Sequence, residues 1–336
     1  MSKRVFITGI AGFLGSHLAE RLVALGHRVA GNDDLSGGYL DNVPKGAELY
    51  EVDCCDLVRM REITEGADVV VHAAAAAHEG LSVFSPSFVV KNNVQASVTT
   101  FSAAITNRVS RIVYCSSIAR YGTNPIPYTE DMVPAPVDPY GIAKVAGEQL
   151  LAQLCRTHGV EHAIAVPHNI IGPRQKYDDP YRNVASIMAN LMLQGRQPYI
   201  YGDGEQMRAF SPVEDVVDCL VKLALDPGMD GLIVNVGPED GYITVNELAA
   251  RVAKAVGFEG LAPIHVEDRP AEVKLATCSA ERARERLGFS PSGDLDASLS
   301  AIVAHIRARG VRPFDYAFEL EIETERTPRT WRDRLL

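Results

Sequence analysis

The stretch VFITGIAGFLGSHLAERLVALG, residues 5–26, decides the fold, because a glycine-rich turn joins a short apolar run to an amphipathic one. Residues 5–7 predict a buried β-strand. In the amphipathic part, leucines recur at the spacing of one helix face, at positions 14, 18, 22 and 25. Gly26 follows directly and is the residue type that commonly ends a helix. Strand, turn and helix in this order predict the first unit of a parallel sheet wound with helices.

Three glycines, Gly9, Gly12 and Gly15, lie in the turn between strand and helix. Glycines there permit a tight turn and let the backbone approach a pyrophosphate, which the amides of the helix N-terminus then bind. We therefore expect them, with Phe13 and Leu14 at the start of the helix, to bind a dinucleotide. The spacing G-x-x-G-x-x-G differs from G-x-G-x-x-G, and such glycines also occur as simple loop residues.

An acidic pair, Asp33 and Asp34, closes the second predicted strand, roughly 20 residues beyond the turn. A carboxylate at that place accepts hydrogen bonds from the hydroxyls of the adenosine ribose. Two negative charges would also repel the 2′-phosphate of NADP, and no arginine follows directly. The pair therefore predicts NAD rather than NADP. The alternative is that Asp33 is a solvated turn residue.

The chain changes character near residue 167. Before it, short β-branched runs alternate with amphipathic stretches, and strands are expected at residues 5–7, 28–30, 49–52, 69–71, 112–114 and 163–166. After it, connections become rich in Pro, Gly and Tyr, with helices expected at 184–194 and 213–225. The fold class is therefore α/β: a Rossmann doubly wound parallel sheet with a smaller, discontinuous α/β substrate domain.

The same pattern gives the expected domain limits. Residues 1–167 form an NAD-binding Rossmann domain, to which a segment at about 211–236, with the apolar run 232–234, is expected to return. Residues 168–210 and 237–312 form the substrate domain. Residues 313–336 are expected to be a C-terminal packing tail.

Composition limits the function. The 336 residues are 46% hydrophobic and 23% charged, with a formal net charge of −10, which is ordinary for a globular chain with a large core. The negative charge argues against nucleic acid as a partner, since phosphate backbones reward a basic surface. No apolar stretch reaches the length of a membrane span, and we expect no signal peptide before the first strand. The six cysteines lack metal-ligand spacing, so we expect no metal and a reducing, cytoplasmic location.

A second group of candidate residues consists of Ser117, Tyr140 and Lys144. Asp138 and Pro139 predict a helix start, which places Tyr140 and Lys144 one turn apart on the same face. A neighbouring ammonium and the positive nicotinamide of NAD⁺ would both favour the phenolate, bringing the pKa of Tyr140 toward neutral pH. Ser117 follows a strand at the carboxyl end of the sheet, where open α/β folds bind ligands. Tyr-x-x-x-Lys also arises by chance, as an exposed Tyr and a solvated Lys.

Together these motifs resemble the extended short-chain dehydrogenase/reductase family. The resemblance rests on the glycine turn, on Ser116-Ser117, on YGIAK at 140–144 and on NIIGP at 169–173, and it covers nearly the whole chain. Within the family, the chain most resembles the NAD-dependent UDP-sugar 4-epimerases, because GDGEQMR at 202–208 is similar to their nucleotide-binding segment. Residues 168–210 and 237–312 would then form a nucleotide-sugar-binding domain.

The resemblance implies contacts to both ligands. Tyr201 would stack on uracil, and Arg208 and Arg269 would bind the diphosphate, which arginine recognises well. The alternatives are core packing for Tyr201, turn or capping roles for Asn169 and Asn183, and surface ion pairs for Arg208 and Arg269. The further NAD contacts are Asp53, Cys54, Ala73, Ala74, Ala75, Asn93, Tyr140, Lys144 and Pro167. The UDP-sugar contacts are Ser116, Ser117, Asn169, Arg174, Asn183, Tyr201, Arg208, Arg269 and Ala276.

The implied reaction is C4 epimerisation through a transient 4-keto sugar. Tyr140 would remove the C4 hydroxyl proton while hydride passes to NAD⁺, and the hydride would return to the opposite face. Ile118 and Ala119 stand where the dehydratases of the family carry an acidic pair, which favours epimerisation over dehydration. A nearby Glu, usual in UDP-glucuronate decarboxylases, is also missing. A net reductase and a non-catalytic NAD-binding protein are the remaining alternatives.

The sugar is less determined. Arg174 could meet a C5 carboxylate and Ala276 could admit an N-acetyl group, so UDP-glucuronate is slightly favoured, with UDP-glucose and UDP-GlcNAc open. Arg120 replaces a residue that is usually small and apolar in relatives, and the sequence offers no explanation for it. The resemblance also implies a homodimer that pairs through helices at 93–106 and 140–155.

Overall fold

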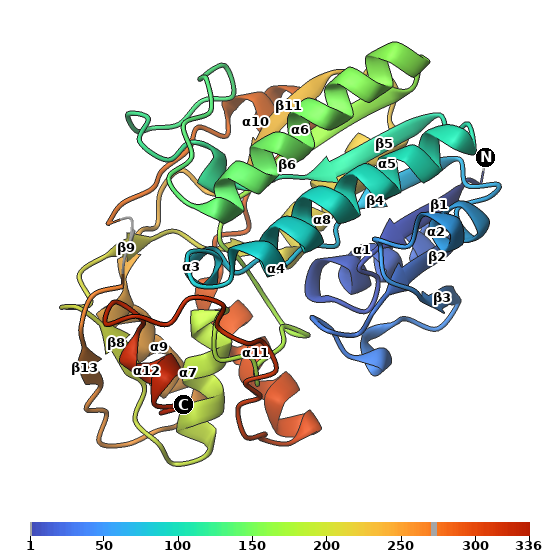
Figure 1. The fold of residues 1–336 in the computed structure, drawn as a ribbon. Coiled ribbons are helices and arrows are strands. Elements are labelled where there is room, and N and C mark those ends of the chain that lie inside the picture. Colours follow the sequence, from blue (N-terminus) through green and yellow to red (C-terminus); the bar gives the residue numbers. More distant parts are fainter. Residues whose placement is uncertain (1, 270–273) are drawn as a thin grey trace.

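The core of the protein is a parallel sheet. In the computed structural model, which describes residues 2–269 and 274–336, seven strands pair in the order β3-β2-β1-β4-β5-β6-β11 (Figure 1). All neighbouring strands run parallel. The chain reverses its direction of progress between β1 and β4, the switch point at which open α/β sheets bind ligands. The strands are β1 (Arg4–Thr8), β2 (Arg28–Asp33), β3 (Ala47–Glu51), β4 (Val69–His72), β5 (Arg111–Cys115), β6 (Glu161–Pro167) and β11 (Leu232–Val236).

The predicted Rossmann fold is confirmed. Each strand expected from the sequence is present, with ends that differ by at most three residues. The return strand is also present, because β11 pairs with β6 from Leu232 to Val236. The β-branched and apolar runs were enough to locate the strands, because helices cover both faces of a parallel sheet and every residue of a central strand is then buried.

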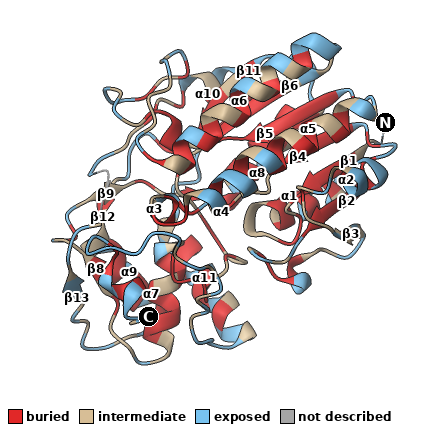
Figure 2. Ribbon diagram, in the orientation of Figure 1, coloured by how far each residue is buried: buried red, intermediate tan, exposed pale blue. Residues whose placement is uncertain are grey.

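Helices cover the two faces of the sheet. Because successive strand residues point to opposite faces, Val5 and Ile7 pack in one apolar core and Phe6 packs in the other. Figure 1 shows α5 and α6 in front of the sheet and α8 behind it, and Figure 2 shows the central strands β4 and β5 as buried. The first core includes α1 (Phe13–Ala24) and α8 (Val213–Leu225), and the second includes α2 (Leu57–Ile63), α5 (Ala96–Thr106) and α6 (Pro139–His158).

The leucine face expected for the first helix is correct in its middle and wrong at its end. Leu18 and Leu22 are fully buried. Leu25 is 48% exposed, because the helix has ended before it and its backbone forms the C-cap. Gly26, with φ of +82°, follows the helix as predicted.

A third apolar core lies outside the sheet, around α7 (Val184–Leu193), α9 (Val245–Val256) and α11 (Leu295–Arg309). A capping box of Thr244 and Glu247 starts α9. Residues of α10 (Glu281–Leu287) pack in the first core instead. The domain limits given above stay predictions. Two-stranded sheets pair β7 (Ile170–Ile171) with β10 (Ser211–Pro212), β8 (Tyr199–Tyr201) with β13 (Ile264–Val266), and β9 (Met207–Arg208) with β12 (Ile243–Thr244).

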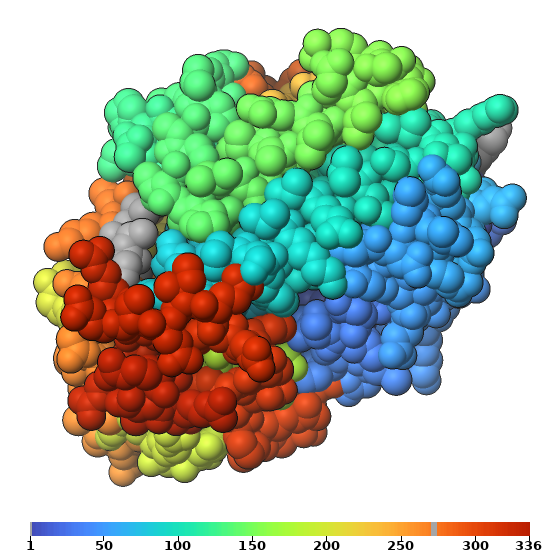
Figure 3. All heavy atoms as spheres, in the orientation of Figure 1, coloured from blue at the N-terminus to red at the C-terminus, as the bar shows by residue number. Residues whose placement is uncertain are grey.

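The C-terminal segment, residues 313–336, contains one short helix, α12 (Arg329–Arg332). Trp331 is 3% exposed and packs in a small apolar cluster with Leu81, Phe84 and Tyr181. In Figure 3 the segment, in red, spreads over the surface beside cyan residues.

In the described part of the chain no helix is long and apolar enough to cross a membrane. The remaining short helices are α3 (Glu79–Ser82), α4 (Pro86–Val90) and the turns Leu40–Asn42, Lys91–Gln95 and Ile118–Arg120.

Candidate active site

One cavity of about 530 Å³ brings most of the predicted residues together. It extends from the glycine turn, past the ends of β2, β4 and β5, to β8 and β9. The predicted residues that line it are Gly9, Gly12, Phe13, Leu14, Gly15, Asp33, Asp34, Asp53, Cys54, Ala73, Ala74, Ala75, Ser116, Ser117, Tyr140, Lys144, Pro167, Asn169, Asn183, Tyr201, Arg208 and Arg269.

The glycine turn is built for a close backbone approach. Gly9 has φ of +73°, and its N–H donates to the Asn32 carbonyl at 2.8 Å. A Cβ on Gly15 would lie 2.0 Å from the Gly9 carbonyl oxygen, so no larger residue fits. The first turn of α1 has neither a side-chain cap nor an acidic residue, which leaves its amides for an anion. The residues present therefore fit the pyrophosphate of NAD.

Asp33 has a second role that the sequence did not reveal. It is buried at the end of β2, and burial raises the pKa of its carboxyl. One oxygen accepts the N–H of Ala11, and the other accepts the N–H of Leu35, both at 2.9 Å. Asp33 thus fixes the glycine turn while it lines the cavity. Asp34 accepts the Ser36 hydroxyl at 2.6 Å.

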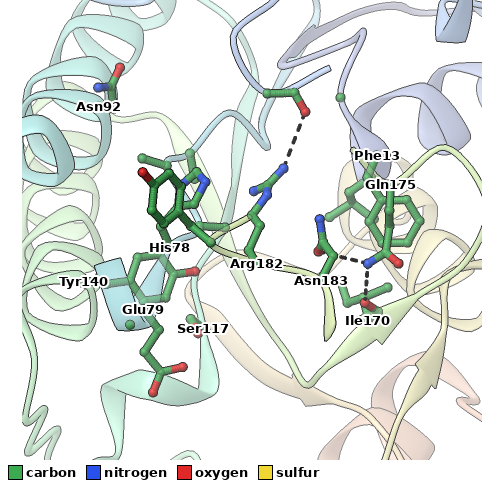
Figure 4. A pocket seen from close by; sticks show the side chains of 18 of the residues that line it. Phe13, His78, Glu79, Asn92, Ser117, Tyr140, Ile170, Gln175, Arg182 and Asn183 are labelled. Carbon is green, nitrogen blue, oxygen red and sulfur yellow. Dashed lines mark hydrogen bonds between the residues drawn. The ribbon is translucent and has the colours of Figure 1, made fainter. Parts of the chain in front are cut away.

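The catalytic candidates lie at the start of α6 and the end of β5. Asp138 caps α6 by accepting the N–H of Gly141 at 2.8 Å, and Tyr140 and Lys144 are both buried in the first turns. The Lys144 ammonium donates to the Cys115 carbonyl at 2.8 Å and lies 5.8 Å from the centre of the Tyr140 ring. Figure 4 shows the Tyr140 hydroxyl on the same side of the cavity as Ser117.

The expected low pKa of Tyr140 is not produced by the chain itself. Burial raises the pKa of this phenol above its ordinary value, and the charge of Glu79 raises it further. A hydrogen bond from Ser117 and the charge of Arg182 act in the opposite direction. Burial also lowers the pKa of Lys144 to about 8. The prediction missed the cost of burying a phenolate, so a reactive phenolate depends on the positive nicotinamide of bound NAD⁺.

Glu79 and Arg182 line the cavity near Tyr140, and both were missed. Glu79 is the first residue of α3, directly after the alanine-rich loop that follows β4, and Figure 4 shows its side chain extending away from the Tyr140 ring. Its place after a strand was the available signal, because strand ends meet at the ligand edge of such sheets. Arg182 donates to the Gly37 carbonyl at 3.4 Å and lies 3.7 Å from the Asp179 carboxylate.

Three predicted residues do not line this cavity. Arg174 turns its guanidinium to Glu20 on α1, with a nitrogen-to-oxygen distance of 2.7 Å. Ala276 lines a small side cavity next to Ile118. Asn93 is buried and donates to the Ala76 carbonyl at 3.1 Å, so it holds the loop after β4.

Arg120, unexplained by the sequence, forms a buried ion pair. Its guanidinium is 2.9 Å from the Glu148 carboxylate of α6, and it also donates to the Tyr121 hydroxyl at 3.1 Å. Glu148 accepts the Ser116 hydroxyl as well. The pair therefore braces the backbone that carries Ser117.

No metal site is present in residues 2–269 and 274–336: no three His, Cys, Asp or Glu side chains are grouped to hold an ion. Each of the six cysteines is free, and five of them are buried.

Comparisons with known proteins agree with this geometry. A UDP-glucose 4-epimerase of Mycolicibacterium smegmatis is 35% identical over 90% of this chain and 98% of its own length. The structure of a UDP-glucose 4-epimerase of Thermotoga maritima with UDP-glucose has a TM-score of 0.85 and 31% identity, over 91% of this chain and 99% of that one. A Thermus thermophilus UDP-glucose 4-epimerase with NAD superposes with a TM-score of 0.81 and 29% identity, over 90% and 99%. Residues 5–237 match the model of the NAD dependent epimerase/dehydratase family. The chain is therefore a member of this family, and its cofactor is NAD.

Proposed function

We propose that the protein inverts C4 of a UDP-hexose by oxidising it transiently and reducing it again. The observation that carries the proposal is that a single cavity joins the glycine turn to Ser117 and Tyr140 and to Arg208 and Arg269. A dinucleotide on the turn would extend its nicotinamide toward Tyr140. A diphosphate bound by the two arginines would leave the sugar between the two halves.

Each residue has a distinct task in this reaction. Tyr140 takes the proton of the C4 hydroxyl, and Ser117 donates a hydrogen bond to the same oxygen. Lys144 holds the nicotinamide ribose, with its ammonium oriented by the Cys115 carbonyl. NAD, held by the glycine turn, would supply the hydride chemistry at C4 in both directions. Arg208 and Arg269 hold the diphosphate while the keto sugar turns.

A neutral hexose suits the cavity better than a uronate. The preference for UDP-glucuronate rested on Arg174, which pairs with Glu20 outside the cavity. Glu79 lines the cavity, and its charge, which raises the pKa of Tyr140, would oppose a C5 carboxylate. We therefore propose UDP-glucose as the preferred substrate, with UDP-GlcNAc next because small Ala276 borders the side cavity.

Dehydration is disfavoured by the residues after Ser117. Ile118 and Ala119 lie in the short turn that follows β5, and neither side chain can donate or accept a proton.

The homodimer expected through α5 and α6 also stays a proposal. The side chain of Ile142, on the first turns of α6, is 56% exposed, and light scattering would test the pairing.

The proposed function is tested by incubating the purified protein with UDP-glucose, UDP-GlcNAc or UDP-glucuronate and no added NAD, followed by proton NMR. The C4-inverted sugar is expected from UDP-glucose, with no net change in cofactor. Release of a keto sugar in proportion to added NAD would point to a dehydrogenase instead. No conversion of any of the three would refute the proposal.

The substitution Glu79→Gln is expected to shift the substrate preference of the protein toward UDP-glucuronate. Removing the repulsion of two carboxylates across a water-filled site is worth about 1 kcal/mol, so the kcat/KM ratio of UDP-glucuronate to UDP-glucose should rise about fivefold. Glu20→Gln is the matched control, since it removes an equal charge outside the cavity. An unchanged ratio in Glu79→Gln would show that this carboxylate does not face the C5 substituent.

A further inference from the structure

The C-terminal segment, expected to be a packing tail, lines the active-site cavity. Phe318, Trp331 and Leu336 are among its lining residues. The Phe318 ring lies 4.6 Å from that of Phe88 and 5.2 Å from that of His78, centre to centre. These contacts place the Phe318 ring against His78, the residue directly before Glu79.

The segment is anchored to the NAD-binding half by backbone and side-chain bonds. The Glu321 carboxylate accepts the N–H of Ser87 at 2.9 Å and of Phe88 at 2.8 Å, at the start of α4. The N–H of Ile322 donates to the Phe84 carbonyl at 2.9 Å. These partners follow α3 directly, so the anchors lie close to Glu79 in the chain.

The segment is also anchored to the other half. The Tyr181 hydroxyl donates to the Phe318 carbonyl at 3.1 Å, and Arg196 donates to the Leu335 carbonyl at 2.7 Å. Thr330 is hydrogen-bonded to the hydroxyl of Tyr201, which the resemblance assigned to uracil. The segment therefore ties the two halves together across the cavity, over the face seen in Figure 3.

Trp331, which lines the cavity, packs between α3 and Tyr181. A Cβ built on Gly80 would lie 3.4 Å from the edge of the indole, and the ring is 5.3 Å from that of Tyr181. The indole thus lies in van der Waals range of the residue that follows Glu79. The tryptophan is held from both sides and cannot move without breaking both sets of contacts.

We propose that the C-terminal segment is part of the nucleotide-sugar site, where Phe318 and Trp331 form an apolar wall that retains the keto sugar until it is reduced. This inference rests on the proposed function. Oxidation breaks the C4–H and O–H bonds and forms a C4 carbonyl, with two electrons and the hydrogen passing as hydride to NAD⁺ and the proton to Tyr140. Loss of the keto sugar at that point would leave the protein with reduced cofactor and no partner to reoxidise it. Side chains that stay in place until the keto sugar has been reduced prevent this loss.

The test measures how often the keto sugar escapes. Glu321→Ala removes two charge-assisted hydrogen bonds and should raise the rate of inactivation per turnover with UDP-glucose about tenfold. Reduced nicotinamide, followed by its absorbance, should accumulate in parallel, and the keto sugar should be detected in solution by NMR. Glu319→Ala is the matched control, because it removes a neighbouring exposed charge while the Glu319 carbonyl still accepts the Ser85 hydroxyl at 2.8 Å.

Two further variants keep the test decisive. Phe318→Ala shortens the wall without touching the anchors, and a chain ending at Arg312 removes the segment and should inactivate fastest. If the shortened chain does not fold, the two point variants decide the matter. Folded Glu321→Ala and Phe318→Ala proteins that inactivate no faster than the parent would overturn the inference. A parent that neither epimerises nor reduces its cofactor would instead refute the proposed function.

Discussion

Tyr140→Phe should lower kcat by about 10²–10⁴-fold, the usual contribution of a positioned acid–base group. The ring is buried against Val89 and Ala119, and phenylalanine keeps this packing while removing the hydroxyl that accepts the proton. Stability and bound NAD should therefore stay near the parent level. Turnover is measured by NMR with UDP-glucose, and cofactor content by absorbance after denaturation.

A second buried tyrosine separates catalysis from packing. Tyr177→Phe removes a hydroxyl that donates to the Gly310 carbonyl at 2.7 Å, outside the cavity lining. Its kcat should stay within about twofold of the parent, because the lost hydrogen bond lies outside the cavity. Its loss should lower the folding stability by about 1 kcal/mol. Tyr140→Phe with more than half of the parent turnover would exclude the phenol as the proton acceptor.

Arg120→Leu should reduce the free energy of unfolding by about 3–5 kcal/mol. The loss arises because Glu148 would remain buried with its charge uncompensated, beside the Ser116 hydroxyl. Urea denaturation, followed by fluorescence of the single tryptophan at position 331, provides the measurement. Glu148→Gln in the same chain should recover much of the loss, because it removes the stranded charge and still accepts a hydrogen bond.

An exposed pair gives the control for this prediction. Arg59→Leu breaks an ion pair with Glu62 in which both side chains are about half exposed, and such pairs contribute about 1 kcal/mol or less. A double variant as unstable as Arg120→Leu alone would mean that arginine contributes packing and not charge neutralisation.

Features that depend on local sequence were predictable. The strands follow from apolar runs, and the glycine turn follows from residues within one strand–helix unit. Tyr140 and Lys144 were placed on one helix face by Asp138 and Pro139, and α6 does begin at Pro139 with Asp138 as its cap. In each case the determining contacts lie within a few residues of one another.

Features that depend on distant partners were not predictable from one sequence. Arg174 is turned away by Glu20, 154 positions earlier in the chain. The C-terminal segment was expected only to pack, because its contacts with Ser87 span 234 positions and leave no periodic signal. Arg120 was a puzzle for the same reason, since its counter-charge lies on another element. The burial that raises the pKa of the Tyr140 phenol was also out of reach, because burial is a property of the folded chain.

The double duty of Asp33 limits how this protein can be re-engineered toward NADP. Its two carboxylate oxygens already hold one amide within the phosphate-binding turn, that of Ala11, and one just after β2, that of Leu35, so exchanging this side chain would loosen the very loop on which any dinucleotide depends. A successful redesign would keep Asp33 and place the positive charge for a 2′-phosphate at Asp34 or Ser36, whose mutual hydrogen bond lies at the surface.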